Sequence, residues 1–82
     1  MNEDRVQAIS SRIEKLIQDG KLEKRDTIEI VNLSPDLIVL MEKHYAENTR
    51  FSTRSCRVIN GENLGTLETY TLHVQYLGEK HA

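Results

Sequence analysis

The residues best suited to chemistry lie in the second half of the chain, on two segments that favour β-strands. Arginine and small polar residues recur there at alternate positions, and they include Arg50, Ser52, Arg54, Thr71 and His73. Because side chains alternate between the two faces of a strand, these residues are expected to share one face of a sheet. A guanidinium binds a phosphate or carboxylate through two hydrogen bonds, and hydroxyl groups can donate to the remaining oxygens. The pattern fits a site for a small anionic ligand such as a nucleotide, or an ordinary solvated sheet face.

Five elements are needed to position these residues, in the order α-β-α-β-β. Helices are predicted at residues 2–19 and 35–47, strands at 27–33, 50–59 and 66–77, and a hairpin loop at 60–65. The sharpest boundary is at Ser34 and Pro35, because serine caps free N–H groups and proline at the first helical position loses no hydrogen bond. The chain 1–82 is therefore predicted to be one small α+β domain with a frayed tail at 78–82.

The register of the predicted hairpin follows from the alternation of apolar residues. Phe51 is expected opposite Val74, since a shift of one residue would turn Phe51 from the core into water. The same register pairs Arg57 with Glu68 and places Ile59 on the core face. It leaves Arg50 and Ser52 on the open face with the other polar residues.

The last strand is expected in the middle of a three-stranded sheet, with both helices covering one face. Such a sheet has two free edges, which can pair with another chain. The first strand carries apolar residues at Ile28 and Ile30 and again at Val31 and Leu33, so it reads as apolar on both faces. These features predict a homodimer formed through a sheet edge.

The first helix offers a second candidate for a dimer interface. Its apolar stripe consists of Val6, Ile9, Ile13 and Leu16, which fit the a and d positions of about two heptads, whereas a coiled coil needs about three or four. The alternative is that this stripe covers the core of its own domain, and that reading is favoured.

The second helix is predicted to pack on the sheet and to touch another helix, because its apolar arc is wide. His44 falls on that arc, where a core histidine bonded to a backbone carbonyl is expected rather than a base with a lowered pKa. His44, His73, His81 and Cys56 show no metal-ligand spacing. We expect no metal, no cofactor and no enzymatic activity; the opposing hypothesis uses His44 or His73 as a base.

Composition narrows the class of partner. The net charge is −2, whereas binding to a nucleic-acid backbone needs a basic surface, so nucleic acid is an unexpected partner. Cys56 is the single cysteine, so the chain forms no internal disulfide. The sequence shows neither a signal-peptide pattern nor an apolar run of about 20 residues. A cytoplasmic protein without a membrane anchor is predicted.

Two functions fit these features. The favoured one is a small intracellular module that binds another protein and acts by occlusion. Small acidic α/β proteins of phages and mobile elements are similar in type, although no motif supports that analogy. The alternative is a binder of a small anionic ligand on the open sheet face.

Overall fold

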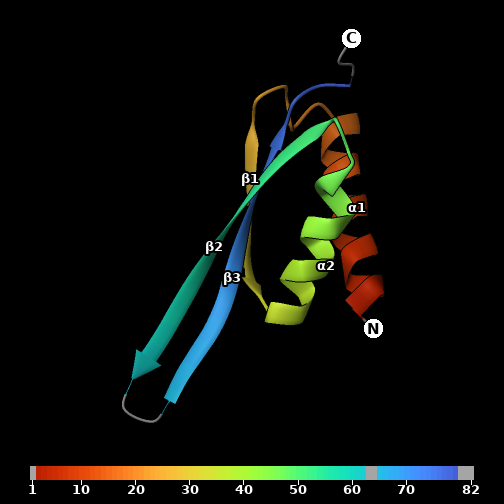
Figure 1. The fold of residues 1–82 in the computed structure, drawn as a ribbon. Helices are drawn as coiled ribbons and strands as arrows, with labels where there is room; N and C mark the ends of the chain where they lie inside the picture. The colour runs from red at the N-terminus through yellow and green to blue at the C-terminus, as the bar shows by residue number, and fades with distance from the viewer. Residues whose placement is uncertain (1, 63–64, 80–82) are drawn as a thin grey trace.

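The computed structural model describes residues 2–62 and 65–79, without the side chains of residues 60–62 and 65–67. Its elements are α1 (Asn2–Gln18), β1 (Thr27–Leu33), α2 (Pro35–Ala46), β2 (Phe51–Glu62) and β3 (Gly65–Tyr76). Figure 1 shows the two helices side by side and the strands running along them. The predicted α+β class and the order α-β-α-β-β are confirmed.

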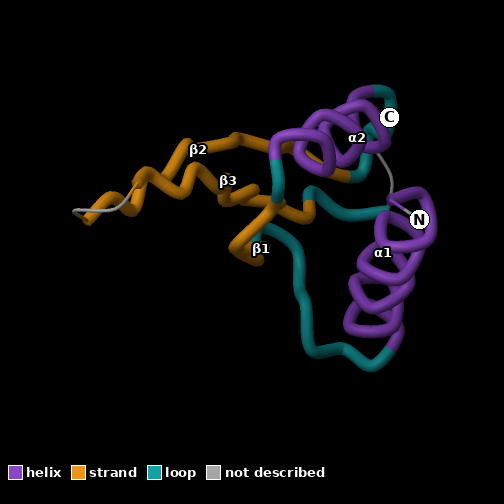
Figure 2. The backbone as a smooth tube through the Cα atoms, turned by 90° about the horizontal axis from the view of Figure 1, so that it is seen from below, coloured by secondary structure: helices purple, strands orange, loops and turns teal. Residues whose placement is uncertain are grey.

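The three strands form one antiparallel sheet in the order β1-β3-β2. The last strand is therefore the central one, as predicted. Figure 2 shows both helices on the same side of the sheet, with the opposite face uncovered.

The start of α2 follows from local sequence. Ser34 is the N-cap, and its hydroxyl oxygen accepts a hydrogen bond of 3.1 Å from the Leu37 N–H. Pro35 is the first helical residue. The helix contacts α1, β2 and β3, so the predicted double contact with a sheet and a second helix is confirmed.

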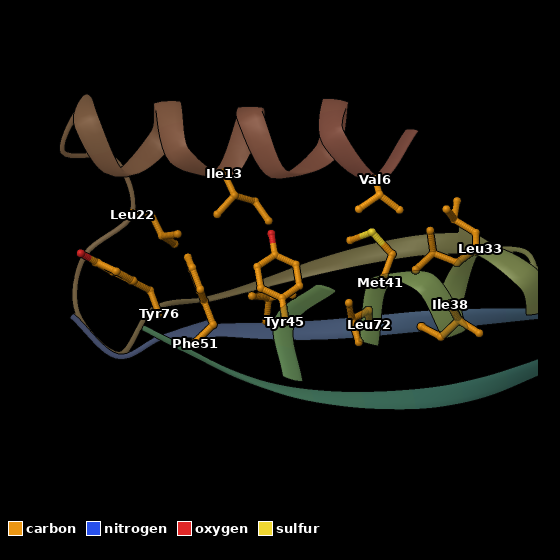
Figure 3. Packing of buried hydrophobic residues seen from close by; sticks show 12 residues of the cluster. Val6, Ile13, Leu22, Leu33, Ile38, Met41, Tyr45, Phe51, Leu72 and Tyr76 are labelled. Atoms are coloured by element: carbon orange, nitrogen blue, oxygen red, sulfur yellow. The ribbon is translucent and has the colours of Figure 1, made fainter. Parts of the chain in front are cut away.

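The core lies between the helices and the covered face of the sheet. Figure 3 shows Val6 and Ile13 pointing from α1 towards Met41 and Tyr45 of α2. The buried residues are Val6, Ile13, Leu22, Leu33, Leu37, Ile38, Met41, Tyr45, Phe51, Leu72, Val74 and Tyr76. Tyr45 packs edge-on against Phe51, with ring centroids 5.1 Å apart.

A β-bulge interrupts β1 and changes which face its last residue takes. Ile30 pairs with Leu72 and Leu33 pairs with Tyr70, so one extra residue is inserted on β1. Asn32 adopts φ 60°, a left-handed conformation that asparagine tolerates better than most residues. Leu33 thereby returns to the core face, with 2% exposure. Of the two residues predicted on the face opposite Ile28 and Ile30, Leu33 is therefore misplaced, whereas Val31 is 55% exposed.

The predicted hairpin register is wrong by two residues. Phe51 pairs with Tyr76, and Thr53 pairs with Val74. A shift of two residues keeps every side chain on its predicted face, which is why the alternation alone did not reveal the difference. The strands also run to Glu62 and from Gly65, so the predicted loop at 60–65 is too long; its positions 63–64 lie outside the described residues.

The β2–β3 hairpin is longer than the layer of helices above it. Figures 1 and 2 show its far end leading away from both helices. The radius of gyration is 14.0 Å, against about 12 Å for a compact domain of this length. Ile59 was predicted on the core face, but it is 53% exposed because no helix reaches it.

Candidate functional site on the open face of the sheet

Four of the five predicted ligand-binding residues lie together on the uncovered face. Arg54 pairs with His73, while the neighbouring pairs are Ser52 with Gln75 and Cys56 with Thr71. Ser52, Arg54, Thr71 and His73 therefore form one patch, and the faces inferred from the alternation are correct for them.

The first strand adds a negative charge to this patch, which sequence reasoning did not place there. Glu29 pairs with His73 on the side away from Arg54. The Glu29 Oε2 atom lies 3.5 Å from His73 Nδ1, and the Glu29 side chain is 62% exposed. A row of Glu29, His73 and Arg54 thus crosses the three strands. The carboxylate opposes the binding of an anion at this row.

Arg54 carries the charge on this patch that could still bind a partner. Its guanidinium has no ion-pair partner among the described residues; it has one weak contact, 3.9 Å from Nη1 to the sulfur of Cys56. Val58, four positions further along β2, and Val31, in β1, are exposed apolar residues. An arginine beside exposed apolar side chains and hydroxyl groups resembles the surface of a protein interface more than an enclosed ligand pocket.

Arg50 does not belong to the patch, so its predicted place on the open face is wrong. Its Nη atoms bind the carboxylate of Glu14 in α1 at 2.8 and 3.1 Å, and Nη2 also lies 2.6 Å from Glu79. The guanidinium lies 5.3 Å from the ring centroid of Phe51 and 5.8 Å from that of Tyr76. These contacts hold α1 against the start of β2. The signal for them is non-local, because Glu14 is distant in sequence.

Glu79, the last described residue of the predicted frayed tail at 78–82, makes side-chain contacts with the domain. Glu79 accepts hydrogen bonds from Arg50 and from the Tyr76 hydroxyl. The Tyr76 hydroxyl and Arg50 hold the pKa of the Glu79 carboxyl below its ordinary value. Residues 80–82 lie outside the described part, and His81 with them.

The apolar stripe of α1, which is the second candidate for a dimer interface, is partly buried in the core. Val6 and Ile13 are buried within the single chain, at 6% and 3% exposure, so they leave little surface for a second copy. Ile9 and Leu16 are half-buried and line a groove of about 330 Å³ between α1 and β1. The favoured reading, that this stripe covers its own domain, agrees with the burial.

His44 is exposed instead of buried, so its predicted core position is wrong. Its Nε2 lies 3.2 Å from the hydroxyl oxygen of Ser10, a residue that sequence reasoning missed. A serine beside a histidine can form a nucleophile and base, but a catalytic histidine is normally oriented by a third group. Among the described residues, His44 has no hydrogen bond to such a third group. The contact joins α1 to α2.

Neither a metal-ligand cluster nor a membrane-spanning helix occurs among the described residues. No group of three or more histidine, cysteine, aspartate or glutamate side chains is placed to hold a metal ion there. No described helix has the length and hydropathy required to cross a bilayer.

The chain was compared with known proteins once this geometry was established. No protein-family model, curated protein or solved structure matches it.

Proposed function

We propose that this chain is a small intracellular protein–protein interaction module, which acts by covering a site on another protein with its open sheet face. The observation that carries the proposal is the one-sided architecture: both helices cover one face, and the other is left uncovered. That face offers exposed Val31 and Val58 together with the guanidinium of Arg54, which has no ion-pair partner in the described part of the chain. Arginine and apolar side chains are enriched where proteins bind one another.

The intracellular assignment rests on the cysteine content. Cys56 is the single cysteine and its thiol is free. Secreted domains of this size usually need disulfides to compensate for a small core. This fold is built without one, which fits the reducing cytoplasm.

The test is affinity capture from the native host with paired variants. Val31→Asp places a charge on the open face, and Val39→Asp places the same charge on α2 at a similarly exposed valine. Wild type and Val39→Asp should recover the same protein partner, and Val31→Asp should lose most of it. Recovery that is unchanged in Val31→Asp and in Arg54→Glu would contradict the proposal.

A small anionic ligand is the second candidate, because Arg54 has no described ion-pair partner and faces His73 directly. A nucleotide at about 100 times its Kd would add about 2.7 kcal/mol of stability, or more than about 10 °C in Tm for a domain of this size. A thermal-shift panel should detect that rise. Arg54→Ala should abolish it, while Arg57→Ala, on the other face of β2, should preserve it. Such a result would replace the first proposal.

The proposed role is binding without catalysis. His44 and Ser10 lack an orienting third group among the described residues, and His73 lies against Glu29 on an open surface. Purified protein should hydrolyse no nucleotide or phosphoester. Hydrolysis that disappears in His73→Ala would overturn this part of the proposal.

A further inference from the structure

The two free edges of the sheet differ in how well they are protected. β1 has seven residues and carries the bulge at Asn32, a feature that discourages pairing with another strand. β2 has twelve residues, and its register with β3 is continuous from Phe51 to Glu62. It contains neither a proline nor a bulge. The β2 edge is therefore the one able to accept another strand.

The backbone groups on that edge can be assigned from the hydrogen bonds of the hairpin. The Leu77 N–H donates to the Arg50 carbonyl across the two strands. Because hydrogen-bonded pairs alternate along an antiparallel ladder, even-numbered residues of β2 bond to β3. The odd-numbered residues Thr53, Ser55, Arg57 and Ile59 then direct their N–H and C=O groups to the free edge.

We propose that a second copy of this chain pairs with the β2 edge in antiparallel orientation, with Ser55 opposite Ser55 of the second copy. A twofold axis perpendicular to the sheet makes each contact occur twice. This register provides about eight new backbone hydrogen bonds, counted from the alternation of the ladder. The result is a continuous sheet of six strands.

The charges of β2 select among the possible registers. Centring the pair on Arg54 or Arg57 would place two guanidinium groups directly opposite each other, which is destabilising. Centring it on Ser55 places Arg54 opposite Cys56 and Arg57 opposite Thr53 of the second copy. No like charges then lie directly opposite each other across the new ladder, and the two Arg54 residues become diagonal neighbours.

The same register covers the exposed apolar residue on the helix side of the hairpin. Ile59 is 53% exposed, and it comes opposite Phe51 of the second copy. Phe51 borders a shallow hollow that is also lined by Ala46 and Leu77. Each copy thus places its projecting Ile59 beside the hollow of the other. A register centred on Cys56 would set Ile59 opposite Thr53, away from this hollow.

The dimer also enlarges the surface of the proposed function, and this step rests on that proposal. With strands about 4.8 Å apart and a rise of about 3.3 Å per residue, the open face of one copy covers roughly 500 Å². A standard interface buries about 800 Å² on each partner. Two copies joined at β2 present roughly 1,000 Å² on one continuous face, with both Arg54 side chains near the twofold axis.

Light scattering and sedimentation of the full chain test the pairing. Wild type should show twice the chain mass of 9.5 kDa at micromolar concentration. Ser55→Pro removes an outward N–H, and Ile59→Lys puts a charge at the contact; each should weaken dimerisation at least about tenfold. Ser55→Ala and Val39→Lys are the matched controls and should stay within about twofold of wild type. A monomeric wild type would overturn the proposal.

A cross-link fixes the register independently. In the double variant Ser55→Cys, Cys56→Ala, the two thiols lie opposite each other at about 5.5 Å between Cα atoms, within reach of a disulfide. Oxidation should join the copies, whereas native Cys56 pairs should form far more slowly. Rapid Cys56 cross-linking would reject the Ser55 register. A wild-type monomer that still captures a partner through Val31 would refute the dimer alone, and a dimer that captures none would refute the proposed function alone.

Discussion

Replacing Arg50 by alanine should destabilise the fold by about 1.5–2 kcal/mol. The Arg50 side chain is 24% exposed and that of Glu14 is 39% exposed. The free energy this pair contributes should therefore lie between that of a surface ion pair, about 0.2–1 kcal/mol, and that of buried charged hydrogen bonds, about 1.5–3 kcal/mol. We assign about 1 kcal/mol to the two bonds with Glu14. The contacts with the rings of Phe51 and Tyr76 add about 0.5–1 kcal/mol.

The assay is urea unfolding at micromolar protein, followed by circular dichroism. In a thermal melt followed by the same signal, a loss of about 1.5–2 kcal/mol would lower Tm by roughly 6–16 °C in a domain of this length. Arg50→Lys keeps the charge but lacks the planar fork, so it should retain less than half of the stabilisation. A double-mutant cycle with Glu14→Gln isolates the pair and should give a coupling of about 1 kcal/mol. A coupling below about 0.3 kcal/mol would refute the view that this pair anchors α1 to β2.

Three further predictions concern other parts of the fold. Leu72→Ala, at a residue with 0% exposure, should cost about 2–5 kcal/mol in urea unfolding. Asn32→Val should cost about 1–2 kcal/mol, since valine resists the left-handed conformation of the bulge, and Asn32→Gly should lose little. Glu79 has a lowered pKa in the fold, so its carboxylate stabilises the protein above its ordinary pKa of 4.5 and this contribution disappears as the pH falls through the lowered value. Glu79→Gln should therefore lower Tm near neutral pH, and the difference from wild type should vanish in strong acid.

The fold was predictable where the signal is local. Ser34 fixes the start of α2 by accepting a hydrogen bond from the Leu37 N–H, and the ring of Pro35 restricts the backbone at the first helical position. Both effects act within a single turn. The alternation after residue 66 fixes the faces of β3, because one side of the sheet must be buried. Four of the ligand-binding candidates were placed on the correct face for the same reason.

The errors arise where distant residues decide the outcome. Arg50 leaves the open face because Glu14 of another element attracts it. Ile59 is exposed because the hairpin extends beyond the helices. The alternation of residues along a strand carries no information about how far the helices reach. The bulge at Asn32 was missed because a single inserted residue leaves the composition of β1 unchanged while it reverses the faces that follow.

The position of β3 in the sheet has a consequence for how the chain acquires its structure. Among the described elements, β3 is synthesised last. Within the described sheet, β1 and β2 each pair only with β3. Thr27 must meet Gln75, so the sheet closes through contacts between distant parts of the chain, which fold slowly. Until β3 leaves the ribosome, the chain can form its helices but carries two strands without partners. Such a nascent chain is open to pairing with other unfinished copies, and its sheet must form after translation of β3.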